Sequence, residues 1–153
     1  MDEVDVVGLL ARACERLIGS LFTTLDEAGF GAVGTTNALA VRMLADGPMT
    51  PGLLASALGV TAQAAGKISG ELEKLGLVVR GTDPRDARAR PLTLTAEGRR
   101  MVDVMREAES AALAGWRRIA DPDDLEALVR ALRAYLESTE QPRAPHTRRI
   151  RFS

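Results

Sequence analysis

The feature that most constrains the fold is a change in the spacing of apolar residues after Gly76. Residues 50–75 repeat their apolar side chains at helical intervals, whereas residues 77–80 and 91–95 alternate apolar and polar side chains. Helices have a side-chain period of 3.6 residues and strands a period of 2. The chain therefore has to pass from helices to a β-hairpin at this point, with the polar segment 81–90 as its loop.

The helical part reads as two short helices. Thr50 and Thr61 stand at N-cap positions. Pro51 occupies a first helical position, where its missing N–H costs nothing, and Gly59 allows a tight turn between the helices. Two short helices joined in this way predict a helix-turn-helix, and the hairpin behind it completes the plan of a winged helix. The expected inward faces are Leu53, Leu54, Ala57 and Leu58 in the first helix and Ala65, Ile68, Leu72 and Leu75 in the second.

Longer amphipathic helices are expected on both sides of this unit. Apolar residues recur every three or four positions from about residue 4 to 28, and again from 96 to 138. Thr35 or Thr36 can cap a helix before the helix-turn-helix, and Thr95 can cap the helix after the hairpin. Aromatic residues make up only 3% of the chain, so the core has to be aliphatic, which favours helices over sheets.

The charge is unevenly distributed. Eight basic and five acidic side chains lie between residues 66 and 100, a net charge of +3 in a chain whose total is −1. A locally basic segment on an acidic body can bind phosphates without making the whole surface basic. This distribution favours a localised nucleic-acid site over a general coat.

Several classes of protein are disfavoured by the sequence. A single cysteine, Cys14, allows no internal disulfide, and the acidic N-terminus does not resemble a secretion signal, so we expect a cytoplasmic protein. No apolar run approaches the ~20 residues that a membrane span requires. The only histidine, His146, lies near the C-terminus, and no nucleophile–base pair or phosphate-binding loop is recognisable. We therefore expect no enzyme activity, no metal and no cofactor.

A long stretch resembles a known family. The sequence TPGLLASALGVTAQAAGKISGELEKLGLVVRGTDPRDARARPLTLTAEG, residues 50–98, is similar to the DNA-binding core of the MarR family of winged-helix regulators. The most specific part is DPRDARARPLTLTAEG, because the family's wing has an Asp-Pro, a further Asp, clustered Arg and a final Leu-Thr-x-x-Gly. With the flanking helices, the resemblance extends over about residues 4–138.

The resemblance implies a mainly α fold with a small β-hairpin wing, in which a winged helix-turn-helix lobe is joined to a helical dimerisation domain. It also implies a transcriptional regulator of duplex DNA, in such families most often a repressor. The expected organisation is a dimerisation helix and linker at 4–34, the DNA-binding lobe at 35–95 (recognition helix about 61–75, wing about 77–95), dimerisation helices at 96–138, and a basic tail at 139–153 whose composition is typical of disorder.

The wing carries the first group of candidate DNA contacts. Arg85, Arg88 and Arg90 on a hairpin tip can reach a narrow minor groove, where the negative potential attracts guanidinium groups. Asp83 and Asp86 are interpreted as turn-forming residues that pair with arginine and shape the loop. The family's tip usually has two adjacent arginines after the second Asp. Alanine occupies the first of these positions here, which makes Arg88 the best candidate for insertion.

The recognition helix carries the second group. Its N-terminal turns are expected to enter the major groove, where Gln63 can pair with adenine and Lys67 with guanine or phosphate. Ala64 can contact a thymine methyl group, and Thr61 with the helix N-terminus suits a phosphate. Gly66 and a second glycine four residues later weaken a helix, so we interpret them as clearance for the DNA backbone or for a neighbouring helix.

The ends of the chain are assigned by the resemblance to self-association. The family forms homodimers through its first helix and its last two, and a two-fold dimer would read a pseudo-palindromic operator. Members often bind small aromatic or phenolic effectors, but no residue of this sequence identifies a ligand; Met43, Met101 and Met105 can line a cavity or fill the core. The candidate dimerisation residues are Val7, Leu10, Leu17, Leu21, Trp116, Leu128 and Leu132.

Two alternatives stay open. One branch of the family senses hydroperoxides through a cysteine in its first helix, but the only tyrosine here, Tyr135, is far away in the sequence, and Cys14 falls on the apolar stripe. We therefore expect Cys14 to pack as a small hydrophobic side chain rather than to act as a redox sensor. The other alternative is a winged-helix module that binds a protein instead of DNA.

Overall fold

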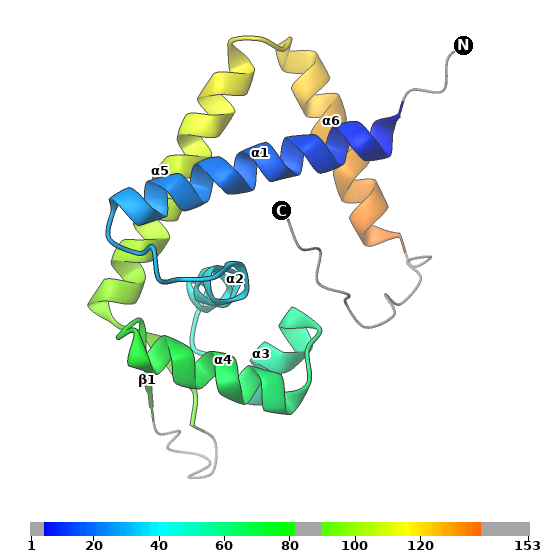
Figure 1. Cartoon of the computed structure of the whole chain (residues 1–153). Coiled ribbons are helices and arrows are strands. Elements are labelled where there is room, and N and C mark those ends of the chain that lie inside the picture. Colours follow the sequence, from blue (N-terminus) through cyan, green and yellow to red (C-terminus); the bar gives the residue numbers. More distant parts are fainter. Residues whose placement is uncertain (1–4, 82–89, 139–153) are drawn as a thin grey trace. The chain divides into compact units, whose positions relative to one another are not determined.

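A computed structural model describes residues 5–81 and 90–138 of the chain (Figure 1). The described residues are mainly helical, with one small antiparallel hairpin, and the predicted winged helix-turn-helix fold is confirmed. The chain divides into two compact units, Met1–Ala112 and Leu113–Ser153. The elements are α1 (Val6–Glu27), α2 (Thr35–Leu44), α3 (Pro51–Leu58), α4 (Ala62–Lys74), β1 (Val78–Arg80), β2 (Leu92–Leu94), α5 (Ala96–Arg117) and α6 (Pro122–Glu137).

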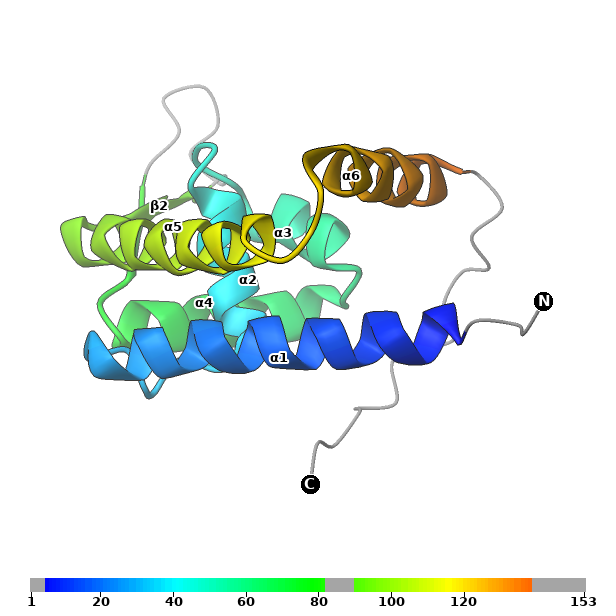
Figure 2. The same cartoon turned by 90° about the horizontal axis from the view of Figure 1, so that it is seen from above.

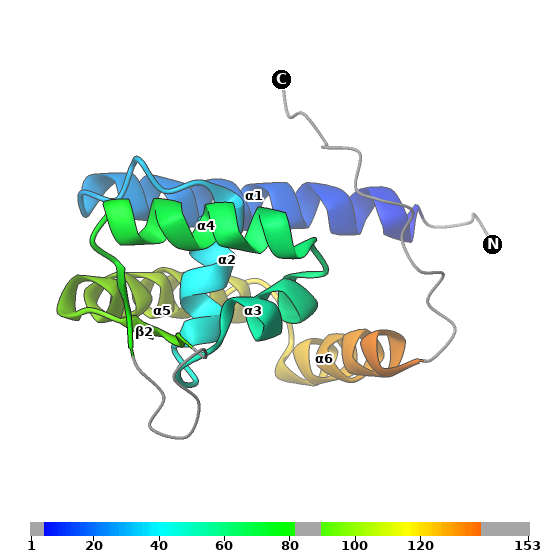
Figure 3. The same cartoon turned by 90° about the horizontal axis from the view of Figure 1, so that it is seen from below.

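The core of the first unit is built around α2. Viewed from above, α2 crosses between α1 and α5 (Figure 2), and from below it passes behind α4 (Figure 3). Its alanine and valine side chains at positions 40 and 41 are fully buried. Aliphatic side chains from every neighbouring element close the core, as the low aromatic content requires. Its fully buried large side chains include Leu25, Leu54, Leu72, Leu77, Leu92 and Met101.

The hairpin is anchored to the helices by a third segment. Val78 pairs with Leu94 and Arg80 with Leu92 in an antiparallel register. Met49, which precedes α3, exchanges two backbone hydrogen bonds with Leu92, of 2.8 and 3.2 Å. The base of the wing is therefore hydrogen-bonded to the start of the helix-turn-helix, a link that no sequence pattern predicted.

Most of the predicted helix starts are confirmed. The hydroxyls of Thr50, Thr61 and Thr95 accept hydrogen bonds from the amides three residues further on. The prediction for α2 was wrong, because its N-cap is Gly34, which makes no side-chain hydrogen bond, and Thr35 is already helical. The helix starts without a side-chain cap, and the buried residues Asn37 and Ala38 pack its first turn against the rest of the lobe.

The buried face of α3 also differs from the prediction. Leu54 and Ala55 are buried, whereas Leu53 is 57% exposed and Ala57 is exposed. The helix is only eight residues long and rich in apolar side chains, so its sequence allows more than one inward face. Packing against α2 and α4, its main contacts, selects Leu54.

The second unit contains the end of α5 and the whole of α6. Asp121 caps α6 by accepting a hydrogen bond of 2.9 Å from the amide of Asp123. No residue of α6 is buried. A shallow groove of 580 Å³ runs along this unit and is lined by Leu113, Arg117, Pro122, Leu125, Glu126, Val129 and Arg130. None of the helices in the described parts of the chain combines the length and apolar character that crossing a membrane requires.

Candidate nucleic-acid interface

Helix α4 is held in the lobe by one face and presents the other to solvent. The buried face consists of Ala65, Ile68, Ser69 and Leu72, so three apolar side chains and one hydroxyl hold the helix. Ser69 satisfies its hydroxyl within the helix, by donating to the carbonyl of Ala65 at 2.7 Å. At 3.6 residues per turn, the opposite face carries Gln63, Gly66, Lys67, Gly70 and Lys74, a set we call the α4 strip.

The α4 strip has an open centre. A Cβ atom added at Gly66 or Gly70 would meet no other described atom within 4 Å. The interpretation that these glycines make room for a neighbouring helix was therefore wrong, because no described helix of the first unit lies against them. Clearance for an external partner stays as the explanation for two residues that each cost a helix about 0.5–1 kcal/mol.

The start of α4 combines a side-chain cap with exposed polar side chains. The hydroxyl of Thr61 accepts a hydrogen bond from the amide of Ala64 at 3.2 Å, which fixes the first turn. The amides at the beginning of a helix have no intrahelical partner and lie at the positive end of the helix dipole. Thr61, Gln63 and Lys67 are exposed around this end, and Ala64 is half-buried. This geometry suits a phosphate group.

Two acidic side chains of α4 form hydrogen bonds or ion pairs with neighbouring residues. Glu71 accepts a hydrogen bond of 3.1 Å from the side-chain amide of Asn37, a buried residue of α2, and it lies 3.9 Å from the Lys67 ammonium. Glu73 pairs with Arg80 of β1 at 2.6 Å. Because both carboxylates are engaged beside the α4 strip, they stabilise the position of the helix and the base of the wing. No sequence signal marks these pairs, since Asn37 and Glu71 are 34 residues apart.

The wing is described only at its base. Arg90 is exposed just before β2, and the amide of Gly81 donates to the carbonyl of Pro91 at 2.8 Å, which closes the base of the loop. The predicted tip residues Arg85 and Arg88, and the shaping residues Asp83 and Asp86, lie outside the described residues. Their roles stay predictions.

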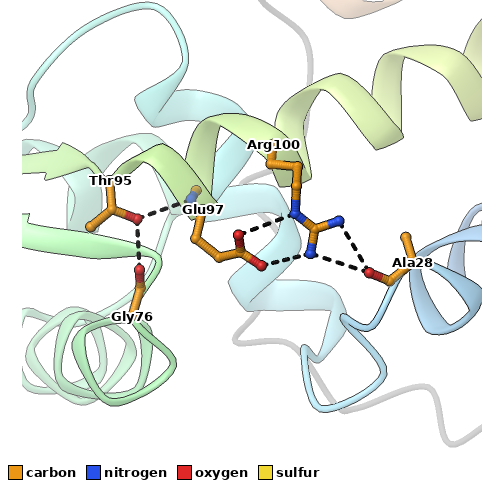
Figure 4. A network of polar contacts seen from close by, with 6 residues as sticks. Ala28, Gly76, Thr95, Glu97 and Arg100 are labelled. Atoms are coloured by element: carbon orange, nitrogen blue, oxygen red, sulfur yellow. Dashed lines mark hydrogen bonds and ion pairs between the residues drawn. The ribbon is translucent and has the colours of Figure 1, made fainter.

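The hairpin is joined to α5 by a tight junction (Figure 4). The Thr95 hydroxyl donates to the carbonyl of Gly76 at 2.6 Å and accepts from the amide of Gly98 at 3.0 Å. The Thr95 amide donates to the carbonyl of Leu77 at 3.0 Å. At Gly98 an added Cβ would overlap that same Leu77 carbonyl oxygen. These contacts explain the Leu-Thr-x-x-Gly sequence at the end of the wing. Leu94 is buried, the Thr95 hydroxyl makes two hydrogen bonds, and only glycine fits beside the Leu77 carbonyl at position 98.

One turn into α5, Arg100 reaches the end of α1 (Figure 4). Its guanidinium donates to the carbonyl of Ala28 and to the carboxylate of Glu97, and it lies 4.2 Å above the centre of the Phe30 ring. The hydrogen bond with Arg100 lowers the pKa of Glu97, and the same bond raises the pKa of Arg100.

We expect the Glu97–Arg100 pair to lose its contribution to stability in acid. Because the pKa of folded Glu97 lies below its ordinary value, its contribution is fully present above the ordinary pKa and is lost as the pH falls through the lowered one. Comparing the melting temperatures of the wild type and Glu97→Gln from pH 7 to pH 3 measures this effect. The difference should be largest at pH 7 and shrink toward acid; a difference that does not change with pH would show that the carboxylate charge contributes nothing.

A small polar pocket lies between the C-terminal part of α2 and the middle of α5. Its volume is 210 Å³, below the usual size of sites for drug-sized ligands. An ion pair between Arg42 and Glu109 crosses it, and Met105 forms part of its wall. Met101 and Met105 are buried in the core and Met43 packs against it, so two of the three candidate methionines serve as core filling. The full lining is Arg42, Ala45, Asp46, Val102, Met105, Arg106 and Glu109.

A comparison with family models finds a match to this lobe. Residues 33–89, from the linker before α2 to the wing, match the model described as the MarR family. The lobe at these positions is similar to the MarR family. The resemblance predicted from the sequence is confirmed, and proteins of this family are generally DNA-binding regulators rather than enzymes. A comparison with curated proteins finds no match.

Solved structures share this fold along most of the chain. RV1404 from Mycobacterium tuberculosis is 25% identical, with a TM-score of 0.76 over 92% of this chain and 97% of that one. CouR from Rhodococcus jostii, bound to p-coumaroyl-CoA, is 25% identical, with a TM-score of 0.66 over 88% and 94%. FabT from Streptococcus pneumoniae, in complex with DNA, is 17% identical, with a TM-score of 0.79 over 88% and 95%, and this likeness concerns the fold alone.

The candidate dimerisation residues of this chain have different environments. On α1, Val7 is 80% and Leu10 40% exposed, whereas Leu17 and Leu21 are half-buried, and Leu21 packs against the core. The candidates of the second unit are half-buried; they are Trp116, Leu128 and Leu132.

Cys14 is exposed on α1 and does not pack in the core of the protomer, so that expectation was wrong. The apolar stripe of α1 is covered only near its C-terminal end, where Leu25 is buried. The redox hypothesis stays a prediction: peroxide should then abolish operator binding in the wild type but not in Cys14→Ser.

Proposed function

We propose that this MarR-family protein is a homodimeric transcriptional repressor that binds a pseudo-palindromic operator in duplex DNA in the cytoplasm and is not an enzyme. The α4 strip is the observation that carries the proposal. It presents two lysines, a glutamine and two glycines on the exposed side of a helix whose other side is buried in a winged-helix lobe. The fold likeness to FabT in complex with DNA supports the same interpretation.

Each part of the surface has a distinct task in this proposal. Gln63 reads adenine and Lys67 contacts guanine or phosphate in the major groove. Ala64 meets a thymine methyl group, while Thr61 and the free amides at the helix start hold a phosphate. The arginines of the wing, at positions 85, 88 and 90, enter the adjacent minor groove. Few side chains of the strip can read bases, so groove shape contributes much of the specificity.

Dimerisation supplies the second half of the operator contact. A two-fold dimer presents two α4 helices to successive major grooves, about 34 Å apart. The exposed apolar side chains of α1 support a partner surface, since Val6, Val7 and Leu9 are each more than half exposed. Large contiguous apolar patches on a monomer usually mark a protein interface.

A small aromatic or phenolic effector would release the protein from DNA. CouR, which is similar to this chain along most of its length, is bound to p-coumaroyl-CoA, a thioester of a phenolic acid. The pocket beside Arg42 is too small for such a ligand as it stands, and the Arg42 guanidinium in it is paired with Glu109. Thermal-shift screening with phenolic acids, followed by release from DNA in the same assay, tests this part of the proposal.

The DNA contact is tested by mutating the α4 strip. We expect Lys67→Ala to weaken binding to all duplexes and to reduce the slope of log affinity against log salt by about one for each phosphate that the lysine neutralises, hence by about two in a dimer. Gln63→Ala should instead weaken binding to the operator by about 1–3 kcal/mol per half-site and leave non-specific affinity unchanged. Fluorescence anisotropy with the upstream duplex and a random duplex measures both effects.

A matched control is Arg130→Ala on α6, which removes an exposed charge outside the proposed DNA surface. It should leave the salt slope and operator affinity as in the wild type. Wild-type protein that binds no duplex at low salt, or an unchanged salt slope in Lys67→Ala, would contradict the proposed DNA contact. Binding to protein partners without salt-dependent DNA affinity would favour the winged-helix interaction module instead.

Dimerisation is tested by placing a charge on α1. We expect Val7→Asp with Leu10→Asp to convert the dimer into a monomer, because each protomer would bury two carboxylates in an apolar interface. Light scattering coupled to size exclusion measures the mass. Both positions are exposed in the protomer, so the double variant should keep its helical circular dichroism. A double variant that stays dimeric would show that the N-terminal half of α1 is not the interface.

A further inference from the structure

The C-terminal end of α1 is hydrogen-bonded to Arg100, a side chain of α5. Ala28 is the C-cap of α1, and its carbonyl accepts hydrogen bonds of 3.2 Å from both terminal nitrogens of Arg100 (Figure 4). Carbonyls at the end of a helix have no intrahelical partner and form the negative end of its dipole. A guanidinium group that donates twice to this oxygen therefore both satisfies it and complements the charge of the helix end.

Arg100 is itself fixed from two further directions. Glu97 accepts hydrogen bonds from its Nε at 3.1 Å and from a terminal nitrogen at 2.6 Å. The guanidinium also lies 4.2 Å above the ring of Phe30, a residue that is only 4% exposed and belongs to the core of the first unit. Such bidentate and stacked contacts use the planar geometry of arginine and are not reproduced by lysine. These contacts hold the side chain, which is about half exposed, between α5 and the end of α1.

Apart from Arg100, the contacts that hold α1 in the first unit are concentrated in the C-terminal half of the helix. Leu25, in its last turn, is its only buried residue, and Leu21 and Phe22 are partly buried against the core. The N-terminal half is exposed, with Val7 at 80%. A helix of 22 residues is about 33 Å long, so a rotation of about 5° at its C-terminal end moves the other end by about 3 Å.

We propose that Arg100 is the positioning residue that fixes the direction of α1 relative to the winged-helix lobe. In a dimer formed through α1, this direction sets the distance between the two α4 helices and hence the half-site spacing that the protein accepts. This consequence rests on the proposed function. Arg100 contacts no DNA in this proposal, since its partners are Ala28, Glu97 and Phe30.

The direction of α1 can be measured without DNA. Cys14 is the only cysteine of the chain and is exposed on α1, and Ser56→Cys adds an exposed site on α3 of the lobe. Spin labels on both, with labelled protomers diluted in excess unlabelled protein, report the distance between helix and lobe by pulsed electron resonance. We expect one narrow distribution with Arg100, and in Arg100→Ala a broader one or a shift of several ångströms. An unchanged distribution in Arg100→Ala would overturn the proposal.

The matched control is Arg106→Ala. Arg106 lies on the same helix, pairs with an acid three residues earlier, Asp103 at 3.6 Å, and is exposed. It should leave the distance distribution as in the wild type. Arg100→Lys keeps the charge but not the planar bidentate geometry, so its distribution should lie between those of the wild type and Arg100→Ala. A full return to the wild-type distribution in Arg100→Lys would show that charge alone, not the proposed geometry, positions α1.

The consequence for DNA is measured with operators whose half-sites are moved apart or together by one and two base pairs. Wild type should prefer one spacing about tenfold or more, and Arg100→Ala should reduce this preference at least threefold with an unchanged salt slope. Equal preference in both proteins would overturn the link between Arg100 and spacing. Absence of DNA binding in every protein, with a distance effect still present, would overturn the proposed function and leave the positioning of α1 standing.

Discussion

Replacing Gly66 with leucine should lower operator affinity tenfold or more while the protein stays folded. A side chain at this position meets open space in the described protein, since no atom lies within 4 Å of an added Cβ. In the proposed complex the DNA backbone occupies the same space, so a leucine side chain would clash with it and weaken binding. Anisotropy with the operator duplex measures the affinity, and circular dichroism with thermal unfolding measures the fold.

The smaller substitution Gly66→Ala sharpens this test because stability and binding should change in opposite directions. Alanine in an open helical position is expected to raise the free energy of unfolding by about 0.5–1 kcal/mol. Its single methyl group should weaken operator binding less than leucine does. Normal binding by stably folded Gly66→Leu protein would refute the idea that the glycines provide clearance for DNA.

Gly98→Ala should destabilise the protein by about 2–4 kcal/mol, because the new methyl group would overlap the Leu77 carbonyl oxygen. That carbonyl accepts a hydrogen bond from the Thr95 amide, so it cannot move without breaking the junction between wing and helix. For a protein of this size the melting temperature should fall by roughly 5–15 °C. Thermal unfolding at one fixed protein concentration measures it, since dimerisation couples stability to concentration.

Gly70→Ala is the matched control for this prediction. It is also a glycine inside a helix, but an added Cβ there meets nothing described within 4 Å. Alanine should therefore stabilise the protein at Gly70 and destabilise it at Gly98. If both substitutions raise the melting temperature, the close approach between α5 and the hairpin is not a constraint on the fold.

The local order of elements was predictable from the sequence because its causes are local. The caps Thr50, Thr61 and Thr95 each bond to an amide three residues away, so spacing alone reveals them. The change from helical to alternating spacing after Gly76 likewise depends on neighbours in the chain. These signals, with the Asp-Pro and Leu-Thr-x-x-Gly ends of the wing, were sufficient to predict the winged-helix fold and the resemblance to the MarR family.

Contacts between distant residues were decided only by the tertiary structure. Packing against α2 and α4 buried Leu54 and left Leu53 exposed, although both are leucines in one short helix. Arg100 reaches Ala28 across 72 residues, and Asn37 reaches Glu71 across 34. No pattern within one element can specify such a pair, because its free energy depends on the positions of two elements at once.

The glycines show this division most clearly. Gly66 and Gly98 both lie inside helices, and helix propensity assigns the same cost to each. The sequence by itself determined that two glycines lie inside the helix now seen as α4 and that one ends the wing signature. Only the tertiary structure decided that a backbone carbonyl packs against Gly98 and that Gly66 faces open space. The physical reason is that the effect of a missing side chain depends on which atoms would lie against its Cβ, and these atoms belong to other elements of the fold.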